Sequence, residues 1–419
     1  MIHQKPFQLL PLAFLTAIAC LPEASTGATI NASSCSQSHV SAAISSATNG
    51  DTVLVPQGTC SWSGLSISKP IYLKGAGVGR TNITISGNTV TKQSGGVIRI
   101  SDFSFSKSGG GNASKGFSIN GSWRNAQPVI FQNNAFTISN SGLFFLDVAG
   151  GVIIAGNSFS GGWDDSFIQP KDSRDTENSW GTADTMGTRD TNGILNHYIE
   201  NNTFHGGTNQ GIDADDATRV VYRYNTLTNS SFNSHGYASS SVGVRHWEVY
   251  NNIWIYDGPK GSPSQDDLSN QGWAIWIRGG TGVIFNNIIP DIRSSWWGDR
   301  QEFRFTIRGA EDHRPQGSCA NVRYPVPRQL GQGHNGSSYV LDPIYIWSNT
   351  GPTDGQVGGW NWGNPCGLTW TNFYLENRDF YRGIAKPGYT PYPYPHPLTQ
   401  AGLTPSPTEI PAPIIRIHD

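Results

Sequence analysis

The segment Val129-Ile130-Phe131-Gln132-Asn133-Asn134-Ala135-Phe136 decides the fold of this chain, because versions of it recur as far as residue 289. Each version is a short β-rich run that ends in Asn, followed by a small residue and then an apolar one. The recurring Asn residues are 134, 157, 202, 225, 252 and 287, and the steps between them are 23, 45, 23, 27 and 35 residues. A fixed Asn with a variable period near 23 is typical of a solenoid of strand coils with insertions at one corner.

These Asn residues predict an internal ladder. Asn tolerates the left-handed bend between strands, and its amide can hydrogen-bond the Asn of the next coil. Stacked Asn side chains would then have their polar atoms satisfied inside the solenoid. Propeller blades are longer than this period, and a leucine-rich repeat would need a Leu framework that this chain lacks.

Composition supports a β-rich globular protein. The 419 residues include 28 Lys+Arg and 30 Asp+Glu, a formal charge of -2, which argues against a nucleic-acid-binding protein. Only 14% of residues are charged, fewer than a soluble helical protein needs. The 50 Gly and 25 Pro residues indicate many turns, and an aromatic content of 11% excludes disorder.

Residues 1–28 are expected to be a signal peptide. Lys5 is followed by an apolar run from Leu9 to Leu21 that is too short to span a bilayer, and then by small residues up to Ala28. We therefore expect a secreted protein, extracellular or periplasmic, with no membrane span. Lipid attachment at Cys20 is an alternative to simple cleavage.

The four cysteines besides Cys20 are consistent with a secreted protein that contains disulfides. They allow three pairings, of which Cys35–Cys60 with Cys319–Cys366 is the local one. Because the chain has no CxxC motif or close Cys/His spacing, a zinc site is not indicated.

The two ends of the solenoid differ from its middle. Val40, Ala43 and Ile44 have helical spacing and predict a short capping helix, and Asn49-Gly50-Asp51 turns into a strand over residues 52–55. After residue 312 the pattern fades. We expect a solenoid domain over residues 29–312 and, over 313–419, an irregular C-terminal cap folded back along the coils, with a Pro-rich tail.

The helical cap, the Asn-Gly-Asp-Thr strand entry and the Asn-Asn-x-Phe coils together resemble the right-handed parallel β-helix superfamily, the pectate-lyase-like proteins. The resemblance covers roughly residues 36–312. It implies an all-β, right-handed parallel β-helix. It does not select one reaction, because the superfamily includes polysaccharide lyases, polygalacturonase-like hydrolases, epimerases, esterases and phage tailspikes.

A second strand in each coil exposes a candidate site. Aligning these strands on one inward apolar residue places Ile168, Ile212, Phe232, Ile275 and Phe305 in one column. The outward residues then form two rows, Gln169, Asp213, Asn233, Trp276 and Thr306, and Lys171, Asp215, His235, Arg278 and Arg308. A dense mixture of Lys, Asp, His and Arg on a rigid sheet favours a functional site over a plain solvated face.

These residues suit β-elimination on a uronic-acid polymer, which requires a neutralised substrate carboxylate and a base for the neighbouring proton. Related lyases use Arg or Lys as the base. We expect Arg278, Arg308 and Lys171 to neutralise the carboxylate. His235 or Lys171 would act as the base, with the pKa of Lys171 depressed by nearby Arg residues. Further predictions cover substrate contacts and a Ca²⁺ site: Gln169, Asn233, Trp276, Trp296, Trp297 and Arg308 would bind substrate, and Asp213, Asp215 and Asp216 could hold Ca²⁺.

Two other functions stay open. Asp215-Asp216 followed by Ser234-His235-Gly236 resembles elements of polygalacturonase-like inverting hydrolases, but the Asn-Thr-Asp element of that family is missing. A non-catalytic carbohydrate-binding β-helix would need the Trp residues but not the charged row.

Overall fold

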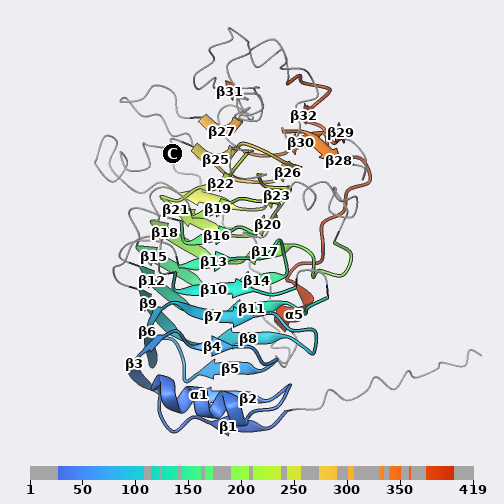
Figure 1. The fold of residues 1–419 in the computed structure, drawn as a ribbon. Coiled ribbons are helices and arrows are strands. Elements are labelled where there is room, and N and C mark those ends of the chain that lie inside the picture. Colours follow the sequence, from blue (N-terminus) through green and yellow to red (C-terminus); the bar gives the residue numbers. More distant parts are fainter. Residues whose placement is uncertain are drawn as a thin grey trace, which may run out of the picture.

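The computed structural model describes residues 27–107, 115–122, 125–138, 143–161, 166–172, 190–206, 211–236, 243–255, 273–289, 301–305, 330–334, 339–350, 358–359 and 374–400. The chain winds through three long sheets in turn, and the coils from β2 to β25 contribute one strand to each of sheets A, B and C (Figure 1). The architecture is the right-handed parallel β-helix that the resemblance implies, with all strand pairs in these three sheets parallel.

The strands of the three sheets are as follows. Sheet A consists of β1 (Thr29–Asn31), β2 (Thr52–Val55), β5 (Tyr72–Gly75), β8 (Ile98–Ser101), β11 (Val129–Gln132), β14 (Val152–Ala155), β17 (His197–Glu200), β20 (Arg219–Arg223), β23 (His246–Tyr250), β26 (Thr281–Phe285), β30 (Ile344–Trp347) and β32 (Phe380–Arg382). Sheet B consists of β3 (Gly58–Ser63), β6 (Thr81–Ser86), β9 (Ser104–Lys107), β12 (Ala135–Ile138), β15 (Ser158–Gly161), β18 (Thr203–Gly206), β21 (Thr226–Thr228) and β24 (Ile253–Ile255). Sheet C consists of β4 (Ser66–Ile67), β7 (Asn88–Thr91), β10 (Phe117–Asn120), β13 (Phe144–Leu146), β16 (Ile168–Pro170), β19 (Ile212–Ala214), β22 (Phe232–Ser234), β25 (Trp273–Ile277), β27 (Gln301–Phe305) and β31 (Gly358–Gly359). A separate antiparallel pair joins β28 (Gln332–His334) and β29 (Tyr339–Leu341).

The first coil is closed as expected. Helix α1 (Gln37–Ser46) lies across the lower end of the solenoid and buries Val40, Ala43 and Ile44, the three residues that predicted it (Figure 1). The predicted Cys35–Cys60 disulfide joins the segment before this helix to β3. Cys319 and Cys366 lie outside the described residues. The helix and the disulfide therefore close and brace the same end of the stack.

The predicted Asn ladder is confirmed along its whole length. In each step the side-chain amide Nδ2 donates to Oδ1 of the Asn in the next coil, at distances of 3.0 to 3.1 Å from Asn134 to Asn287. The ladder then continues to Asn349, 62 residues further along the chain, at 2.8 Å. The backbone N–H of each ladder Asn donates to the same Oδ1, so every rung ties backbone and side chain of one coil to the next.

The bend at each rung falls one residue earlier than we expected. The left-handed residue is the one before the ladder Asn, with φ of 55° at Asn201 and Asn251 and 65° at Gly156. The ladder Asn itself turns inward and is buried. Asn-Asn pairs therefore combine two roles, a left-handed corner and an internal hydrogen-bonding group.

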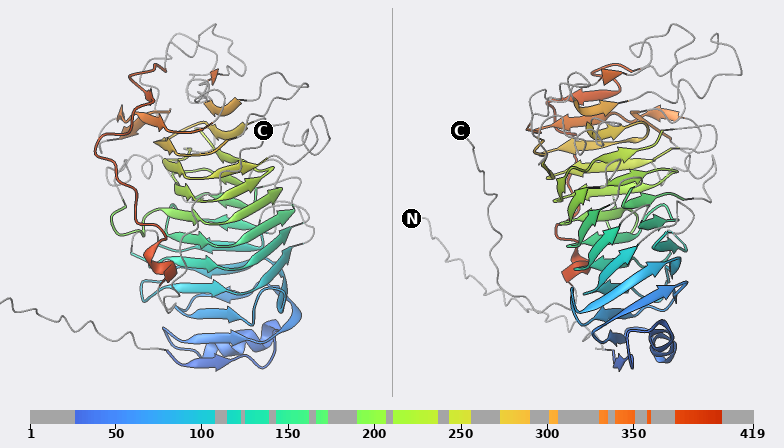
Figure 2. Two further views of the ribbon diagram at one scale, coloured as in Figure 1. Left: turned by 180° about the vertical axis from the view of Figure 1, so that it is seen from behind. Right: turned by 90° about the vertical axis from the view of Figure 1, so that its left-hand side faces the viewer.

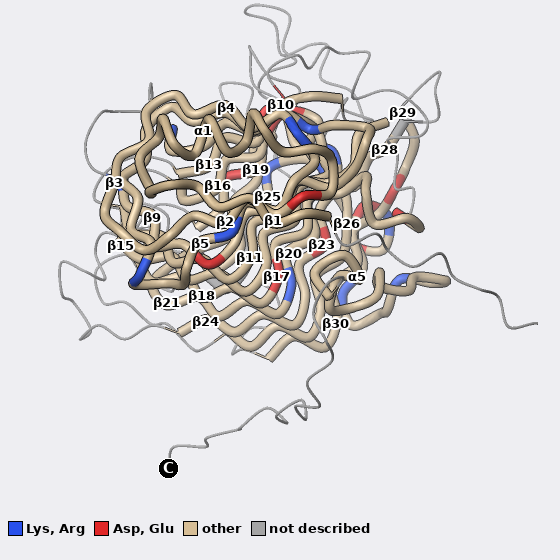
Figure 3. The backbone as a smooth tube through the Cα atoms, turned by 90° about the horizontal axis from the view of Figure 1, so that it is seen from below, with Lys and Arg blue, Asp and Glu red and all other residues tan. Residues whose placement is uncertain are grey.

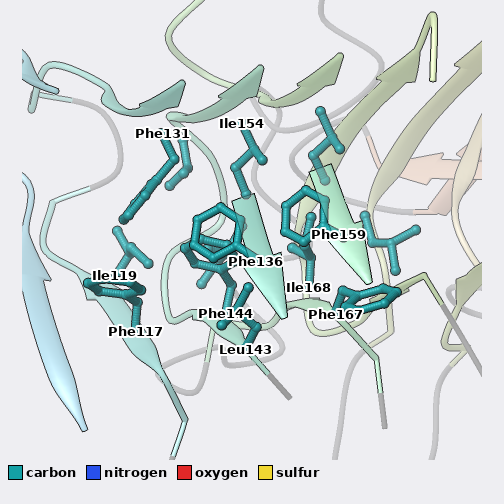
Figure 4. Close-up of a cluster of buried hydrophobic side chains, with 14 of the residues drawn as sticks. Phe117, Ile119, Phe131, Phe136, Leu143, Phe144, Ile154, Phe159, Phe167 and Ile168 are labelled. Carbon is teal, nitrogen blue, oxygen red and sulfur yellow. The ribbon is translucent and has the colours of Figure 1, made fainter. Parts of the chain in front are cut away.

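The interior on the sheet B side is a column of aromatic rings. Phe105, Phe136, Phe159 and Phe204 occupy one register position in consecutive coils and stack at centroid distances of 4.7 to 5.3 Å. Phe117, Phe131 and Phe144 fill the space opposite them (Figure 4). Because the coil spacing is about 4.8 Å, offset stacking of identical rings fits the repeat without adjustment.

The strand stack extends past residue 312, where we expected the solenoid to end. Strands β30 and β32 add to sheet A, and β31 adds to sheet C. Coil formation therefore continues after the Asn-Asn-x-Phe pattern has become too irregular to recognise.

Residues 386–400 form a C-terminal strap that returns along the outer face of sheet A and ends in helix α5 (Pro397–Gln400), as Figure 2 shows. Arg223, whose side chain is 0% exposed, pairs with Glu200 at 2.6 Å and also donates to the backbone carbonyls of Tyr392 and Pro393. The backbone N–H of His396 donates to the other Glu200 oxygen at 2.7 Å. The strap thus satisfies a buried ion pair that sheet A could not satisfy alone.

Among the described residues no helix is long and apolar enough to cross a membrane. The predicted signal peptide lies largely outside them, since the description begins at residue 27.

We predict that Asn202→Ala lowers the free energy of unfolding by about 2–6 kcal/mol, because it removes the Oδ1 that accepts from the buried N–H and side-chain amide of Asn157 and the Nδ2 that donates to Asn225. The neighbouring Asn201→Gly is the matched control. Asn201 is exposed with φ of 55°, and Gly156 fills the same place in the preceding coil, so its effect should stay within about 0.5 kcal/mol. Chemical denaturation followed by circular dichroism measures both; equal losses would contradict the role of the ladder.

Acid should destabilise the fold through His197. Burial lowers the pKa of His197 to about 3 in the folded protein, while its Nε2 hydrogen-bonds the carbonyl of Val148 at 2.8 Å. The unfolded chain binds this proton below its ordinary pKa of 6.5, so stability is full above that pH. It then falls by about 1.4 kcal/mol per pH unit as the pH drops toward the folded pKa.

Unfolding titrations across this range, on the wild type and on His197→Gln, test the linkage. The variant should show a shallower dependence on pH. His39→Gln, at an exposed position of α1, should keep the wild-type slope. An unchanged slope in His197→Gln would mean that another group is responsible.

Candidate functional site

Sheet C brings the expected rows together, with one correction. Ile212 pairs with Ile168 and Phe232, and Phe232 pairs with Ile275, as predicted. In the next strand, however, Ile275 pairs with Phe303 rather than with Phe305. The alignment of Thr306 and Arg308 with these rows was therefore two residues out of register, and Arg304 takes the position beside Trp276.

Lys171 and two aspartates form the centre of the cluster. Lys171 follows the last residue of β16, and Asp215 and Asp216 follow β19 in the next coil. The Lys171 Nζ lies 3.1 Å from Asp216 Oδ2 and 3.5 Å from Asp215 Oδ2. The Lys171 side chain keeps an exposed fraction of 33%, so one ammonium that contacts two carboxylates also faces solvent.

His235 follows β22 and lies beside the same carboxylates. Its Nε2 is 2.9 Å from Asp213 Oδ1, and its Nδ1 is 3.9 Å from Asp215 Oδ2. Asn233 donates its Nδ2 to the same Asp213 oxygen at 3.2 Å and is only 1% exposed. Asn233 was expected to contact substrate; in the structure it instead supports Asp213, which in turn fixes the imidazole.

The turn after β19 is strained. Asp216 has φ of 32° and Ala217 has φ of 53°, two consecutive left-handed residues without a glycine. Hydrogen bonds hold the turn: the Ala217 N–H donates to Gly243 O at 2.7 Å, and the Thr218 hydroxyl donates to Asp215 O. Such strain persists only where the surroundings enforce it, and here it directs the Asp216 carboxylate toward Lys171.

The expected effect on Lys171 is reversed. We anticipated that neighbouring Arg residues would depress its pKa and favour a neutral base. Burial does lower the pKa of Lys171, but the charges and hydrogen bonds of Asp215 and Asp216 outweigh it, so the net pKa is raised above its ordinary value of 10.5. Lys171 is therefore a cation at neutral pH and is poorly suited to accept a proton.

Arg278 is more buried than we expected for a residue that neutralises a substrate carboxylate. It is 5% exposed, its guanidinium carbon lies 4.3 Å from the centre of the Trp276 ring, and its Nε donates to Ser234 O at 3.1 Å. The guanidinium therefore fixes the partly exposed Trp276 through a cation–π contact.

Packing explains why residue 236 of the Ser234-His235-Gly236 element is a glycine. A Cβ at residue 236 would lie 2.2 Å from the backbone oxygen of Arg278. Only glycine allows the chain after His235 to pass so close to the next coil. The resemblance to the hydrolase element at this glycine therefore has a structural cause.

Two residues of the site were missed by the sequence alignment. Phe145 lies in the same outward row as Gln169 and Asp213, and Asp147 lies beside Lys171 in register, both on or just after β13. The run Leu143-Phe144-Phe145-Leu146-Asp147 has the same alternation as the run from Phe167 to Lys171 and could have been aligned with it. Arg308, Trp296 and Trp297 lie outside the described residues.

Charged residues are few in this chain, at 14% of all residues. Figure 3, which looks along the solenoid, shows that most of the described backbone carries neither Lys, Arg, Asp nor Glu. Within the described residues no group of three or more His, Cys, Asp or Glu side chains is arranged to hold a metal ion. Asp215 and Asp216 both contact the Lys171 ammonium, and the Ca²⁺ site stays a prediction.

No protein-family model and no curated protein matches the chain. Among solved structures, the chain is similar to a PL6 family polysaccharide lyase from Pseudopedobacter saltans, with a TM-score of 0.41 and 14% sequence identity over 77% of this chain and 76% of that one.

We predict that Asp216→Asn lowers the pKa of Lys171, because the variant removes a carboxylate 3.1 Å from the ammonium. Titration of ¹³C-labelled lysine by NMR measures it, with the wild-type pKa expected above 10.5. Asp102→Asn, which removes the partner of Lys74 far along the chain, is the control and should leave Lys171 unchanged. A wild-type Lys171 that titrates below its ordinary value would restore it as a candidate base.

Proposed function

We propose that this protein is a secreted enzyme that cleaves an acidic, uronic-acid-containing polysaccharide by β-elimination. The observation that carries the proposal is that a cationic Lys171 and His235, whose imidazole is fixed by Asp213, both lie beside the Asp215 carboxylate on the outer face of one rigid sheet. These are the two components that the reaction requires: a positive charge for the substrate carboxylate and a placed proton acceptor.

Lys171 supplies the positive charge. The raised pKa keeps its ammonium protonated, Asp215 and Asp216 hold the ammonium in place, and the partly exposed side chain can contact a uronate carboxylate there. A cation beside that carboxylate stabilises the negative charge that develops when the proton on C5 is removed. In this proposal Lys171 alone neutralises the substrate carboxylate, a role that we had expected it to share with Arg278 and Arg308.

His235 is the proton acceptor in this proposal. A neutral imidazole that donates its Nε2–H to Asp213 keeps a lone pair on Nδ1. Nδ1 takes the C5 proton, the electron pair forms the C4–C5 double bond, and the C4–O bond breaks. The leaving oxygen then accepts a proton, from the imidazolium or from water, so that atoms and charge balance. Asp213 orients the ring throughout, as carboxylates do in catalytic histidine pairs.

Inverting hydrolysis is the alternative chemistry. It needs a protonated carboxylic acid facing a carboxylate across the sugar. Asp215 and Asp216 instead both lie against the Lys171 ammonium, an arrangement better matched to binding a cation than to donating a proton. A carbohydrate-binding protein without activity is the other alternative, and it would not require His235.

Secretion is supported by the Cys35–Cys60 disulfide, because such bonds persist in oxidising compartments, and by the apolar run at Leu9 to Leu21. The Ca²⁺ prediction is not used in the mechanism; exhaustive chelation before the assay would test it separately.

The test is a panel of pectate, alginate, glucuronan, glycosaminoglycans and neutral glycans, each read for unsaturated ends by ultraviolet absorbance and for new reducing ends. Both signals should rise together on an acidic polymer. His235→Ala should lower kcat by about 10²–10⁴-fold with the fold intact. His205→Ala, an exposed histidine on sheet B, is the matched control.

Three outcomes would contradict this proposal. Reducing ends without unsaturated ends would indicate hydrolysis. Binding without either signal would indicate a binding protein. Full activity in His235→Ala would exclude His235 as the base.

A further inference from the structure

The outer face of sheet C carries one row of side chains, here called the outer row, in which Phe145, Gln169 and Trp276 are partly exposed while Asp213 and Asn233 are buried. In register from the N-terminal coils onward it contains Ser66, Thr89, Ser118, Phe145, Gln169, Asp213, Asn233 and Trp276. Consecutive members belong to consecutive coils and are therefore about 4.8 Å apart. Figure 1 shows the strands that carry them, from β4 to β25, stacked along the solenoid.

The chemical character of the row changes at Phe145. The three members before it are small and neutral. Beyond Phe145 the row enters the charged cluster, with Asp213 in the row and Lys171 and His235 beside it. Trp276 closes the cluster on the far side. Two aromatic side chains thus mark the two edges of the reactive groups.

Both rings are held by the sheet. Phe145 lies partly exposed between the buried residues Phe144 and Leu146, so the alternation of β13 turns its ring outward. Trp276 is also partly exposed and packs on the buried Arg278 guanidinium at 4.3 Å. A fixed aromatic ring loses little conformational entropy when a ligand stacks on it.

We propose that Phe145 and Trp276 are two stacking platforms of one oligosaccharide site, on opposite sides of the reactive cluster, so that the sugar chain runs along the solenoid axis. This deepens the proposed function and rests on it for the class of substrate. Four coil steps separate the two platforms, about 19 Å. Each sugar of an extended polysaccharide adds nearly the same length as the spacing between two neighbouring coils. Successive sugars can therefore lie over successive coils across the cluster.

The consequence is a preference for chain length. A sugar on Phe145 and another on Trp276 can be engaged together only by an oligosaccharide that crosses the whole cluster. Short oligosaccharides reach the reactive groups but not both platforms. Cleavage therefore falls inside a bound chain, with sugar residues required on both sides of the broken bond.

The experiment measures binding and cleavage separately. Binding of oligogalacturonates and alginate oligomers, from disaccharide to octasaccharide, is measured by calorimetry in the His235→Ala background, with cello-oligosaccharides as the neutral control. Phe145→Ala should weaken binding of the octasaccharide of the accepted polymer by about 5- to 30-fold and leave the disaccharide unchanged. Trp276→Ala should do the same, and Phe145→Tyr should restore the affinity.

Ser118→Ala is the matched control, since it lies in the outer row one coil before Phe145 and should have no effect. Thermal unfolding of each variant separates a lost platform from a lost fold. In otherwise wild-type enzyme, Phe145→Ala should raise KM for long chains by the same factor with little change in kcat.

The two proposals fail in different ways. If no polymer is cleaved but the length-dependent loss in Phe145→Ala is seen, the platform inference holds and the elimination mechanism falls. If polymer is cleaved and both alanine variants bind all lengths like the parent, the platform inference is overturned. Absence of binding to any acidic oligosaccharide overturns it as well.

Discussion

The hydrogen bond from one Asn side chain to the next is the interaction on which the rest of this structure depends. Each rung joins Nδ2 of one coil to Oδ1 of the following coil, and the same Oδ1 accepts a backbone N–H. A slip of one residue would turn the Asn side chain away from the interior and leave buried donors and acceptors unpaired, which is costly in a low-dielectric core. The ladder therefore fixes the register at one corner of the coils from Asn134 to Asn349, while loops of different length are accommodated elsewhere.

The fixed register at the Asn corner also sets the positions of the other strands in these coils. Once the Asn corner is set, the interior rings stack at the coil spacing and the sheet C strands lie in register, although 45 residues separate Asn157 from Asn202. Lys171, Asp215 and His235 come from three successive coils and meet because their strands are hydrogen-bonded neighbours. A rigid sheet, rather than a loop, positions these groups, which suits chemistry that requires precise placement.

Buried charge is handled in two different ways in this molecule. On sheet A, Glu200 and Arg223 are fully enclosed and are satisfied by carbonyls and an N–H of the C-terminal strap. On sheet C, Asp215 and Asp216 are buried, but the Lys171 side chain that pairs with them keeps an exposed fraction of 33%. The first arrangement attaches the strap to the solenoid. The second leaves a charged group that can exchange one partner for a ligand, and this difference is the physical reason to place function on sheet C.

The sequence alone determined the repeat, the Asn ladder and the capping helix, because each depends on spacing within or between neighbouring coils. It left three pairings of four cysteines open, and the structure decided for Cys35–Cys60. The sequence also determined which residues face outward from β16 to β25, since alternation along a strand is a local property. Only the tertiary structure decided the contacts between coils. It paired Ile275 with Phe303, buried Arg278 and Asn233, and placed Asp216 close enough to Lys171 to raise rather than lower its pKa. Electrostatic effects depend on distances of a few ångströms and on burial, and neither quantity can be obtained from the order of residues along the chain.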